Sequence, residues 1–471
     1  MRATKIVATI GPASGEPAML ERMIDAGLDI ARLNFAHGTS EQHAQTVALI
    51  RAASQRVGRE VAVLQDVPGP KLRLGPVMGG LVELAPDSEV VLTSRRVEGT
   101  AERLPIAWEG LPALMQAGDV VYLADGAIRM RVREVADGEV LADVEVGGTV
   151  ASRQGMNLPN VNMALPAVSA EDHRLIEDGL AMGVDILALS FVRRREDLDP
   201  VREHLRASGR EAVPLIAKIE KPQAAENAAE IVEAADGIMV ARGDLGIELP
   251  IEEVPLVQKR LLHLAGQHSK PAITATQMLE SMVHSSRPTR AEVTDVANAI
   301  FDGTDAVMLS QETAIGQDPV GVIRMMAAIA ETTERELPYG RWLVDRGVRS
   351  TDPASAISYG AVGAVYQLGL KAIVTPTISG GTARLISANR PNVPVLALSP
   401  HPDVVRRCAL YWGVRPMLHA EPANTTELID ACAAAALEAG VAGPGDRIGI
   451  TAGLPAGRTG GTNMFKVHTL D

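Results

Sequence analysis

Aromatic residues, lysines and cysteines are all scarce in this sequence. Aromatic side chains make up 3% of the 471 residues, so aliphatic side chains and alanine must fill the core. Eight of the 45 basic residues are lysines and the rest are arginines. Where lysine is this scarce, a lysine inside an apolar run needs a reason. Cys408 and Cys432 are too few and too isolated for a disulfide framework or a structural zinc site.

Charge and hydropathy exclude further classes of protein. The net charge of −13 argues against a nucleic-acid-binding surface, which needs a basic face, but it leaves room for a local basic pocket. No apolar run approaches the ~18 residues of a membrane span. The first residues, MRATK, lead into a short apolar strand and not into a signal peptide. We therefore expect a soluble, cytoplasmic protein with neither nucleic acid nor membrane as a partner.

Short aliphatic runs, each followed by a helical pattern, recur along the chain. Most of them lack polar alternation, as expected for parallel strands buried on both faces. Eight strand–helix units in succession predict an α/β fold built on a (β/α)8 barrel, the TIM-barrel architecture. The predicted strands are residues 5–10, 30–34, 61–65, 186–190, 214–219, 237–240, 272–275 and 306–309. The predicted helices between them include residues 16–26, 40–57, 170–182 and 255–267.

The pattern changes twice along the chain, whose length predicts about three domains. Between the third and fourth strands, alternating runs at 120–123, 128–135 and 140–146 predict an inserted all-β domain. After about Leu337, five further strand candidates with intervening helices predict an open α/β sheet. The predicted domains are a catalytic barrel of residues 1–70 and 166–337, an inserted β-barrel of residues 71–165, and a C-terminal α/β domain of residues 338–471.

Polar residues at the ends of two neighbouring predicted strands form the strongest candidate site. In a (β/α)8 barrel the active site lies at the carboxyl ends of the strands. Lys218 and Glu220 are two residues apart at the exit of one strand, so they lie on the same side of it. Asp244 follows the next strand, close enough to Glu220 for the two carboxylates to share a cation. Such a pair suits Mg²⁺ or Mn²⁺, and zinc is not expected without cysteine or histidine nearby.

The alternative interpretation is a structural ion pair between Lys218 and Glu220, since structural networks also place charges at such sites. Asp244 on the neighbouring strand end favours a functional site. The turn at Gly243 and Asp244 leads into a short helix, whose exposed amides would bind a substrate carboxylate, although a lone Gly-Asp pair by itself favours a plain turn. Thr276 ends the seventh strand, where its hydroxyl would orient a water or relay a proton, although threonines at strand ends are usually structural.

Arginines on the same side of the barrel predict a phosphoryl group as the ligand. Arg32 and Asn34 end the second strand, His37 follows shortly after, and Arg73 lies at the junction with the inserted domain. Arginines that face a Mg²⁺ site commonly clamp phosphoryl oxygens. Lys218 would be the cation closest to the transferred group and would offset charge in the transition state.

Six stretches, in order along the chain, resemble the pyruvate kinase family. They are TKIVATIGPAS at 4–14, RLNFAHG at 32–38, KIEK at 218–221, MVARGDLG at 239–246, ATQMLESM at 275–282 and RPTRAE at 287–292. Several such motifs in family order are a highly specific signal, and the resemblance covers essentially the whole chain. It implies transfer of a phosphoryl group from phosphoenolpyruvate to ADP, which gives ATP and pyruvate in glycolysis.

The resemblance implies a role for each candidate residue. By position it assigns the contacts to the phosphoryl group to Arg32 and Lys218, and the binding of the divalent metal to Glu220 and Asp244. It assigns the binding of the substrate carboxylate to Gly243, Asp244 and Thr276. It assigns the binding of the nucleotide to Asn34, His37 and Arg73. Thr276 would also lie on the path of proton delivery. The inserted domain would be a lid that closes over the nucleotide and excludes water. The resemblance further implies a homotetramer.

Departures from the family pattern concern the monovalent cation. Many family members need K⁺ and carry a serine, a threonine and a glutamate where this chain has Ala36, Val67 and Lys71. Ala36 removes an oxygen ligand of the ion, and Lys71 brings an ammonium group near the ion's place. Two positive charges a few Å apart repel by roughly 4 kcal/mol at an effective dielectric near 20. We predict that K⁺ is not required and that Lys71 substitutes for it, rather than being a solvated hinge residue.

A second departure lies on the nucleotide side. Gln311 and Ile315 differ from the family pattern, and Ile315 stands where the family's lysine reaches ATP phosphates. Either ADP binds more weakly here, or Arg73 and His37 contribute more to its binding.

Hydroxyls and glycines between a strand and a helix of the C-terminal region form a candidate phosphate site. Its members are Thr377, Ser379, Gly380, Gly381 and Thr382. By resemblance this is the family's allosteric loop, which residues 453–462 would face. The expected effector is a sugar phosphate or a nucleotide monophosphate, and the alternative is a loop that persists without an effector.

Two other functions fit part of the pattern. A lyase or aldolase that forms an enolate of pyruvate at Mg²⁺ would share Glu220 and Asp244 but would not need the lid or the nucleotide contacts. A non-catalytic relative that senses metabolites through its third domain would explain Gln311 and Ile315, whereas the presence of Lys218 argues against it.

Overall fold

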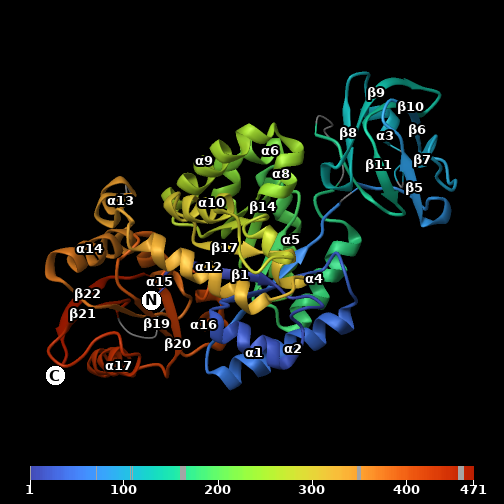
Figure 1. Ribbon diagram of the computed structural model, residues 1–471. Helices are drawn as coiled ribbons and strands as arrows, with labels where there is room; N and C mark the ends of the chain where they lie inside the picture. The colour runs from blue at the N-terminus through green and yellow to red at the C-terminus, as the bar shows by residue number, and fades with distance from the viewer. Residues whose placement is uncertain are drawn as a thin grey trace.

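The computed structural model of the chain describes residues 2–70, 72–106, 108, 110–159, 166–346, 352–454 and 461–471. These residues form a central barrel, an inserted β-rich domain on one side of it and a C-terminal α/β domain on the other (Figure 1). No helix in the described part of the chain is long and apolar enough to cross a membrane.

Eight parallel strands of the described residues close into a barrel, which confirms the predicted (β/α)8 architecture. They are β1 (Lys5–Thr9), β2 (Ile30–Asn34), β3 (Ala62–Val67), β13 (Ile186–Leu189), β14 (Leu215–Ile219), β15 (Gly237–Ala241), β16 (Ala272–Ala275) and β17 (Ala306–Leu309). β1 pairs with both β2 and β17, so the first and last strands of the barrel close the sheet. Every residue of β1, β3, β14 and β15 is buried, which explains the missing polar alternation.

The barrel helices follow the strands and cover the outside of the barrel. They are α1 (Pro17–Ala26), α2 (Ser40–Val57), α4 (Ala170–Met182), α5 (Asp199–Ala207), α6 (Pro222–Glu226), α7 (Ala228–Ala234), α8 (Arg242–Glu248), α9 (Val254–Gln267), α10 (Arg290–Phe301), α11 (Gln311–Ala314) and α12 (Pro319–Glu334). α2 and α4 have the predicted bounds. Each begins with a capping box, at Thr39 or Ser169, and ends at a left-handed glycine, Gly58 or Gly183.

Aliphatic side chains fill the inside of the barrel. Leu64, Ile186, Ile216, Met239 and Ile273 belong to this inner cluster and are fully buried. The packed interior leaves the ends of the barrel for ligand binding, and in this architecture the carboxyl ends of the strands carry the active site.

The inserted domain consists mainly of short antiparallel strands. Its elements are β4 (Leu72–Arg73), β5 (Leu81–Leu84), β6 (Glu89–Thr93), β7 (Arg103–Pro105), α3 (Leu111–Leu114), β8 (Val120–Leu123), β9 (Ile128–Ala136), β10 (Glu139–Val146), β11 (Gly148–Ala151) and β12 (Gly155–Asn157). One sheet has the order β4-β12-β8-β9-β10-β6-β7, and β5 pairs with β11. Leu74 forms an isolated antiparallel β-bridge with Ile106, and the Gly75 N–H donates a hydrogen bond of 2.8 Å to the Pro105 carbonyl. These contacts join the two edges of the larger sheet.

The C-terminal domain is an open five-stranded sheet with helices. Its elements are α13 (Tyr339–Arg346), α14 (Pro353–Leu368), β18 (Ile373–Pro376), α15 (Gly381–Ala388), β19 (Val395–Ser399), α16 (Pro402–Cys408), β20 (Val414–Leu418), α17 (Thr425–Glu438), β21 (Arg447–Ala452) and β22 (Met464–Thr469). The strand order is β20-β19-β18-β21-β22, with β22 antiparallel to β21. Lys5 Nζ donates to the Val414 carbonyl at 2.6 Å, and Arg390 pairs with Asp305 at 2.6 Å. Both contacts link this domain to the barrel.

Candidate active site

A buried lysine lies at the centre of the polar cluster at the barrel mouth. Lys218 is the fourth residue of β14 and is 8% exposed. Its Nζ lies 2.9 Å from Asp66 Oδ1, 2.7 Å from Ser190 Oγ and 2.9 Å from Glu220 Oε1. These partners come from the carboxyl ends of β3, β13 and β14. The structure therefore brings Lys218 and Glu220 together as their spacing predicts.

Arg32 joins the same cluster through Asp66. Its Nε and Nη2 atoms lie 2.8 and 2.7 Å from Asp66 Oδ2, and its Nη1 atom donates to Thr9 Oγ1 at 2.8 Å. Asp66 thus holds both cations, one on each oxygen. Sequence reasoning did not select Asp66 as a site residue. The available signal was a carboxylate near the end of a fully buried strand.

Electrostatics keep this cluster charged. Burial by itself would raise the pKa of Asp66, but the positive charges of Lys218 and Arg32 outweigh it and lower the pKa of Asp66 below its ordinary value. Burial by itself would lower the pKa of Lys218, but the carboxylates of Asp66 and Glu220 outweigh it and raise the pKa of Lys218 above its ordinary value. Lys218 is therefore a cation at neutral pH.

Glu220 and Asp244 form the candidate metal pair. Glu220 Oε2 accepts a hydrogen bond of 2.7 Å from the Phe191 N–H. Glu220 Oε1 is in ionic contact with Lys218 but has no hydrogen bond of regular geometry within the described residues. Burial raises the pKa of Glu220, Lys218 opposes this, and the nearby Asp244 charge adds to the increase. Asp244 is half-buried in the first turn of α8.

A divalent cation fits this environment. The negative charges of Asp66, Glu220 and Asp244 all raise the pKa of Lys218, and the positive charge of Arg32 opposes them, so carboxylates outnumber cations around Lys218. In the described ranges, no group of three histidine, cysteine, aspartate or glutamate residues is arranged to hold a metal. Two carboxylates completed by water or substrate oxygens are a common site for Mg²⁺.

Thr276 has a strained backbone beside this pair. Its φ is +72°, a conformation that is a genuine outlier for a β-branched residue. Its Oγ1 atom accepts the Gly243 N–H at 2.6 Å and donates to the Ala275 carbonyl at 2.6 Å. Arg242 holds the turn by donating to the Thr276 carbonyl at 2.7 Å. A substrate carboxylate that binds Gly243 must therefore replace the threonine oxygen, and Arg242 is a supporting residue that sequence reasoning missed.

The residues predicted to reach the nucleotide are partly or fully exposed. Asn34 ends β2, where its Oδ1 accepts the Ala36 N–H at 3.2 Å, and His37 is exposed in the following turn. Arg73 is exposed on β4 of the inserted domain and donates to the Arg153 carbonyl at 3.3 Å. Lys71 lies outside the described residues. Ile315 follows α11 and is 55% exposed.

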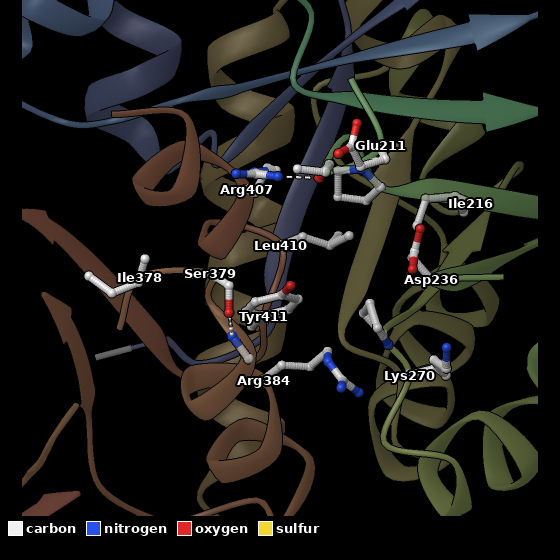
Figure 2. A pocket seen from close by; sticks show the side chains of 14 residues that line it. Glu211, Ile216, Asp236, Lys270, Ile378, Ser379, Arg384, Arg407, Leu410 and Tyr411 are labelled. Atoms are coloured by element: carbon white, nitrogen blue, oxygen red, sulfur yellow. Dashed lines mark hydrogen bonds between the residues drawn. The ribbon is translucent and has the colours of Figure 1, made fainter. Parts of the chain in front are cut away.

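The candidate effector loop lies beside a cavity between the barrel and the C-terminal domain. The Gly380 N–H donates to Thr377 Oγ1 at 2.9 Å, and Thr382 Oγ1 lies 2.7 Å from Thr462 Oγ1. Residues 455–460, part of the segment expected to face the loop, lie outside the described residues. The cavity has a volume of about 370 Å³. Its lining, seen in Figure 2, includes Ser379, the acidic side chains Glu211 and Asp236, and cationic side chains of both domains. These cations are Lys270, Arg384 and Arg407.

Two models of known families match the chain. A family model described as "Pyruvate kinase, barrel domain" matches residues 1–323. A second one, described as "Pyruvate kinase, alpha/beta domain", matches residues 355–468. The two matches cover the barrel with its inserted domain and most of the C-terminal domain.

Curated relatives resemble the chain over almost its full length. A protein of Staphylococcus saprophyticus named pyruvate kinase is 44% identical over 471 residues, which is 99% of this chain and 80% of that protein. The pyruvate kinase of Geobacillus stearothermophilus is 44% identical over 472 residues, 100% of this chain and 80% of its own. The pyruvate kinase of Staphylococcus aureus strain USA300 is 42% identical over 471 residues, which is 99% of this chain and 80% of that protein.

Proposed function

This chain is a phosphotransferase of the pyruvate kinase family, and on that premise we propose that it transfers the phosphoryl group of phosphoenolpyruvate to ADP, in glycolysis and in the cytoplasm. The observation that carries the proposal is the buried Lys218 between Asp66 and Glu220, beside Arg32. In the reaction, the phosphorus–oxygen bond of phosphoenolpyruvate breaks, a bond to a β-phosphate oxygen of ADP forms, and the enolate takes up a proton at carbon.

Lys218 and Arg32 are proposed to contact the phosphoryl group. Phosphoryl transfer depends mainly on positioning and on offsetting negative charge. Asp66 holds both cations, so their charges are oriented before substrate arrives. The raised pKa of Lys218 keeps its charge available over the physiological pH range.

Glu220 and Asp244 are proposed to hold Mg²⁺ or Mn²⁺. Such an ion, when bound, neutralises charge on the phosphoryl and enolate oxygens. The buried Glu220 oxygen without a directed hydrogen bond and the nearby charge of Asp244 support this assignment.

Thr276, Gly243 and Asp244 are proposed to hold the substrate carboxylate. When the carboxylate accepts the Gly243 N–H, the Thr276 hydroxyl is released from that bond. Thr276 Oγ1 would then pass a proton toward the enolate carbon. The strained Thr276 backbone supports a functional role, because such strain persists where the surroundings enforce it.

The nucleotide is proposed to bind between the barrel rim and the inserted domain, which acts as a lid. Asn34, His37 and Arg73 would contact it, and Lys71 would replace K⁺ near the phosphates. Assays in buffer free of Na⁺ and K⁺ and in 100 mM KCl, on the order of cellular salt, should give similar rates. Strong activation by KCl would contradict the replacement of K⁺ by Lys71.

A sugar phosphate or a nucleotide monophosphate is the proposed effector at the 377–382 loop, and a homotetramer is the proposed assembly. Thermal unfolding measured with fructose bisphosphate, ribose 5-phosphate and AMP tests the first point. A shift of the melting temperature with one of them would support an effector site, and no shift with any would favour a loop without an effector. Light scattering tests the assembly.

One assay separates the proposed function from its rivals. Pyruvate formed from phosphoenolpyruvate is measured with and without ADP. Turnover that requires ADP supports the kinase, pyruvate formed without ADP indicates a different enolate enzyme, and no turnover favours a metabolite sensor.

A further inference from the structure

A buried carboxylate connects the inserted domain to the candidate metal pair. Glu248 ends α8, and its side chain is 0% exposed. Its Oε1 atom accepts hydrogen bonds from Lys221 Nζ at 2.5 Å and from Asn157 Nδ2 at 3.0 Å. Asn157 is 3% exposed and ends β12, the strand from which the chain leaves the inserted domain. One oxygen atom thus joins the lid to the barrel.

The same carboxylate is placed to control the position of Asp244. Asp244 and Glu248 are four residues apart on α8, so they lie one turn apart on the same face. α8 has only seven residues, and a helix this short depends on tertiary contacts for its stability. Its last residue is held by Asn157 and Lys221, so these contacts fix the orientation of the turn that carries Asp244.

Lys221, the second partner of Glu248, connects the same network to Glu220. Lys221 follows Glu220 directly, and its Nζ lies 5.8 Å from the centre of the Phe191 ring. Phe191 holds Glu220 through its backbone N–H and has a φ of +56°. A non-glycine residue keeps such a conformation when its surroundings hold it there. Lys221, anchored by Glu248, is part of those surroundings.

The network is not built for stability alone. Glu248 Oε2 and Asn157 Oδ1 are buried and have no hydrogen-bond partner among the described residues. Buried acceptors without partners cost free energy, and a buried ion pair is weak evidence for stability. Proteins break the rule that buried polar atoms are hydrogen-bonded most often at sites where function requires it.

We propose that Glu248 is a positioning residue that couples the docking of the lid to the geometry of Glu220 and Asp244. The inference rests on the proposed function, because it assumes that this pair holds the divalent metal. When Asn157 contacts Glu248, Glu248 and Lys221 hold α8 and the end of β14 in place. This sets the distance between Glu220 and Asp244 that the metal requires. Coupling of this kind is reciprocal, so the metal must favour docking of β12 as much as docking favours the metal.

The test measures Mn²⁺ binding to the full chain without substrate, by electron paramagnetic resonance. The variant Asn157→Ala removes the lid contact and leaves the Lys221–Glu248 pair intact. Thr149→Ala is the matched control, because it removes another side-chain hydrogen bond of the inserted domain, the exposed 2.6 Å bond to Glu83, which involves no barrel residue. Glu220→Gln is the control for the metal site itself.

We expect Asn157→Ala to weaken Mn²⁺ binding about tenfold, the lower end of the loss seen when a group that orients a metal ligand is removed. Thr149→Ala should bind Mn²⁺ like the unaltered chain. Hydrogen exchange gives a second readout: Mn²⁺ should slow exchange of the β12 amides in the unaltered chain and not in Asn157→Ala. In turnover assays, the Mn²⁺ concentration for half-maximal rate should rise while the rate at saturating Mn²⁺ changes little.

The outcomes separate the two proposals. If Glu220→Gln does not reduce Mn²⁺ binding, the metal assignment is wrong. If Glu220→Gln abolishes binding but Asn157→Ala leaves both binding and β12 exchange unchanged, the metal site stands and the coupling through Glu248 is wrong.

Discussion

Lys218 Nζ lies 2.9 Å from Asp66 Oδ1, although 152 residues separate them in the sequence. The contact joins the ends of β3 and β14, two strands with β13 between them. The second oxygen of Asp66 binds Arg32. A single carboxylate therefore orients the two cations proposed to contact the phosphoryl group.

Asp66→Asn should reduce kcat about 100-fold, the scale for removing one electrostatic contact in an active site. Asparagine has nearly the same shape, so the fold should persist. Its neutral amide no longer helps to raise the pKa of Lys218. The alkaline limb of the kcat–pH profile should therefore move to lower pH. An unchanged profile with reduced kcat would mean that Asp66 acts in another way.

Lys218→Met should abolish turnover, with a loss of at least about 1,000-fold, because the cation proposed to be closest to the transferred group is removed. Circular dichroism should show an intact fold. Lys259→Met is the control, since Lys259 is an exposed lysine on α9 that pairs with Asp302. Substantial turnover by Lys218→Met would contradict the assigned role.

Lys5 should make the stability of the protein depend on pH in the alkaline range. Burial lowers the pKa of Lys5 to about 8 in the folded chain, from an ordinary value of 10.5. Between these values the unfolded chain binds a proton that the folded chain does not, so stability rises with pH. The gain from this group, complete above the unfolded pKa, is about 3 kcal/mol.

The comparison with Lys5→Met isolates this effect from other titrating groups. The difference in melting temperature between the unaltered chain and the variant should shift in favour of the unaltered chain from pH 7.5 to pH 10. A constant difference over this range would show that Lys5 keeps its ordinary pKa.

Ile315→Lys should lower the KM for ADP several-fold, because it restores the cation that the family places near the nucleotide phosphates. Ile315 is 55% exposed, so the longer polar side chain should not disturb packing. Val344→Lys, at an exposed position of α13, controls for the added charge. Equal KM values for ADP in the two variants would exclude position 315 from nucleotide binding.

Lys71→Glu should make the enzyme depend on K⁺. The substitution removes the proposed built-in cation and restores the carboxylate of the K⁺-dependent family members. Turnover in KCl-free buffer should fall at least about tenfold, a loss of 1.4 kcal/mol of transition-state stabilisation, and 100 mM KCl should restore part of it. Loss of activity that KCl does not restore would indicate a different role for Lys71.

Much of the fold was predictable because its signals are local. β2, β16 and β17 have their predicted bounds, and for β16 and β17 these are the limits of uninterrupted buried runs that polar residues follow. The ends of α2 and α4 follow from capping boxes and glycines within a few residues of each helix. The pairing of Lys218 with Glu220 required only the two-residue period of a strand.

Contacts between distant segments were not predictable from such signals. Arg242 supports Thr276 through backbone carbonyls, which carry no sequence signature. Asn157 and Glu248 meet across 91 residues, and neither stands out in its own segment.

The sequence by itself determined the barrel, its insertion and the strand ends that carry Lys218, Glu220 and Asp244, because periodicity and helix caps act over a few residues. Only the tertiary structure decided which groups orient those side chains. Asp66 contacts Lys218 because the barrel closes, and Glu248 contacts Asn157 because the inserted domain packs on the barrel. Their effect on charge and position depends on burial, and burial is a property of the assembled fold.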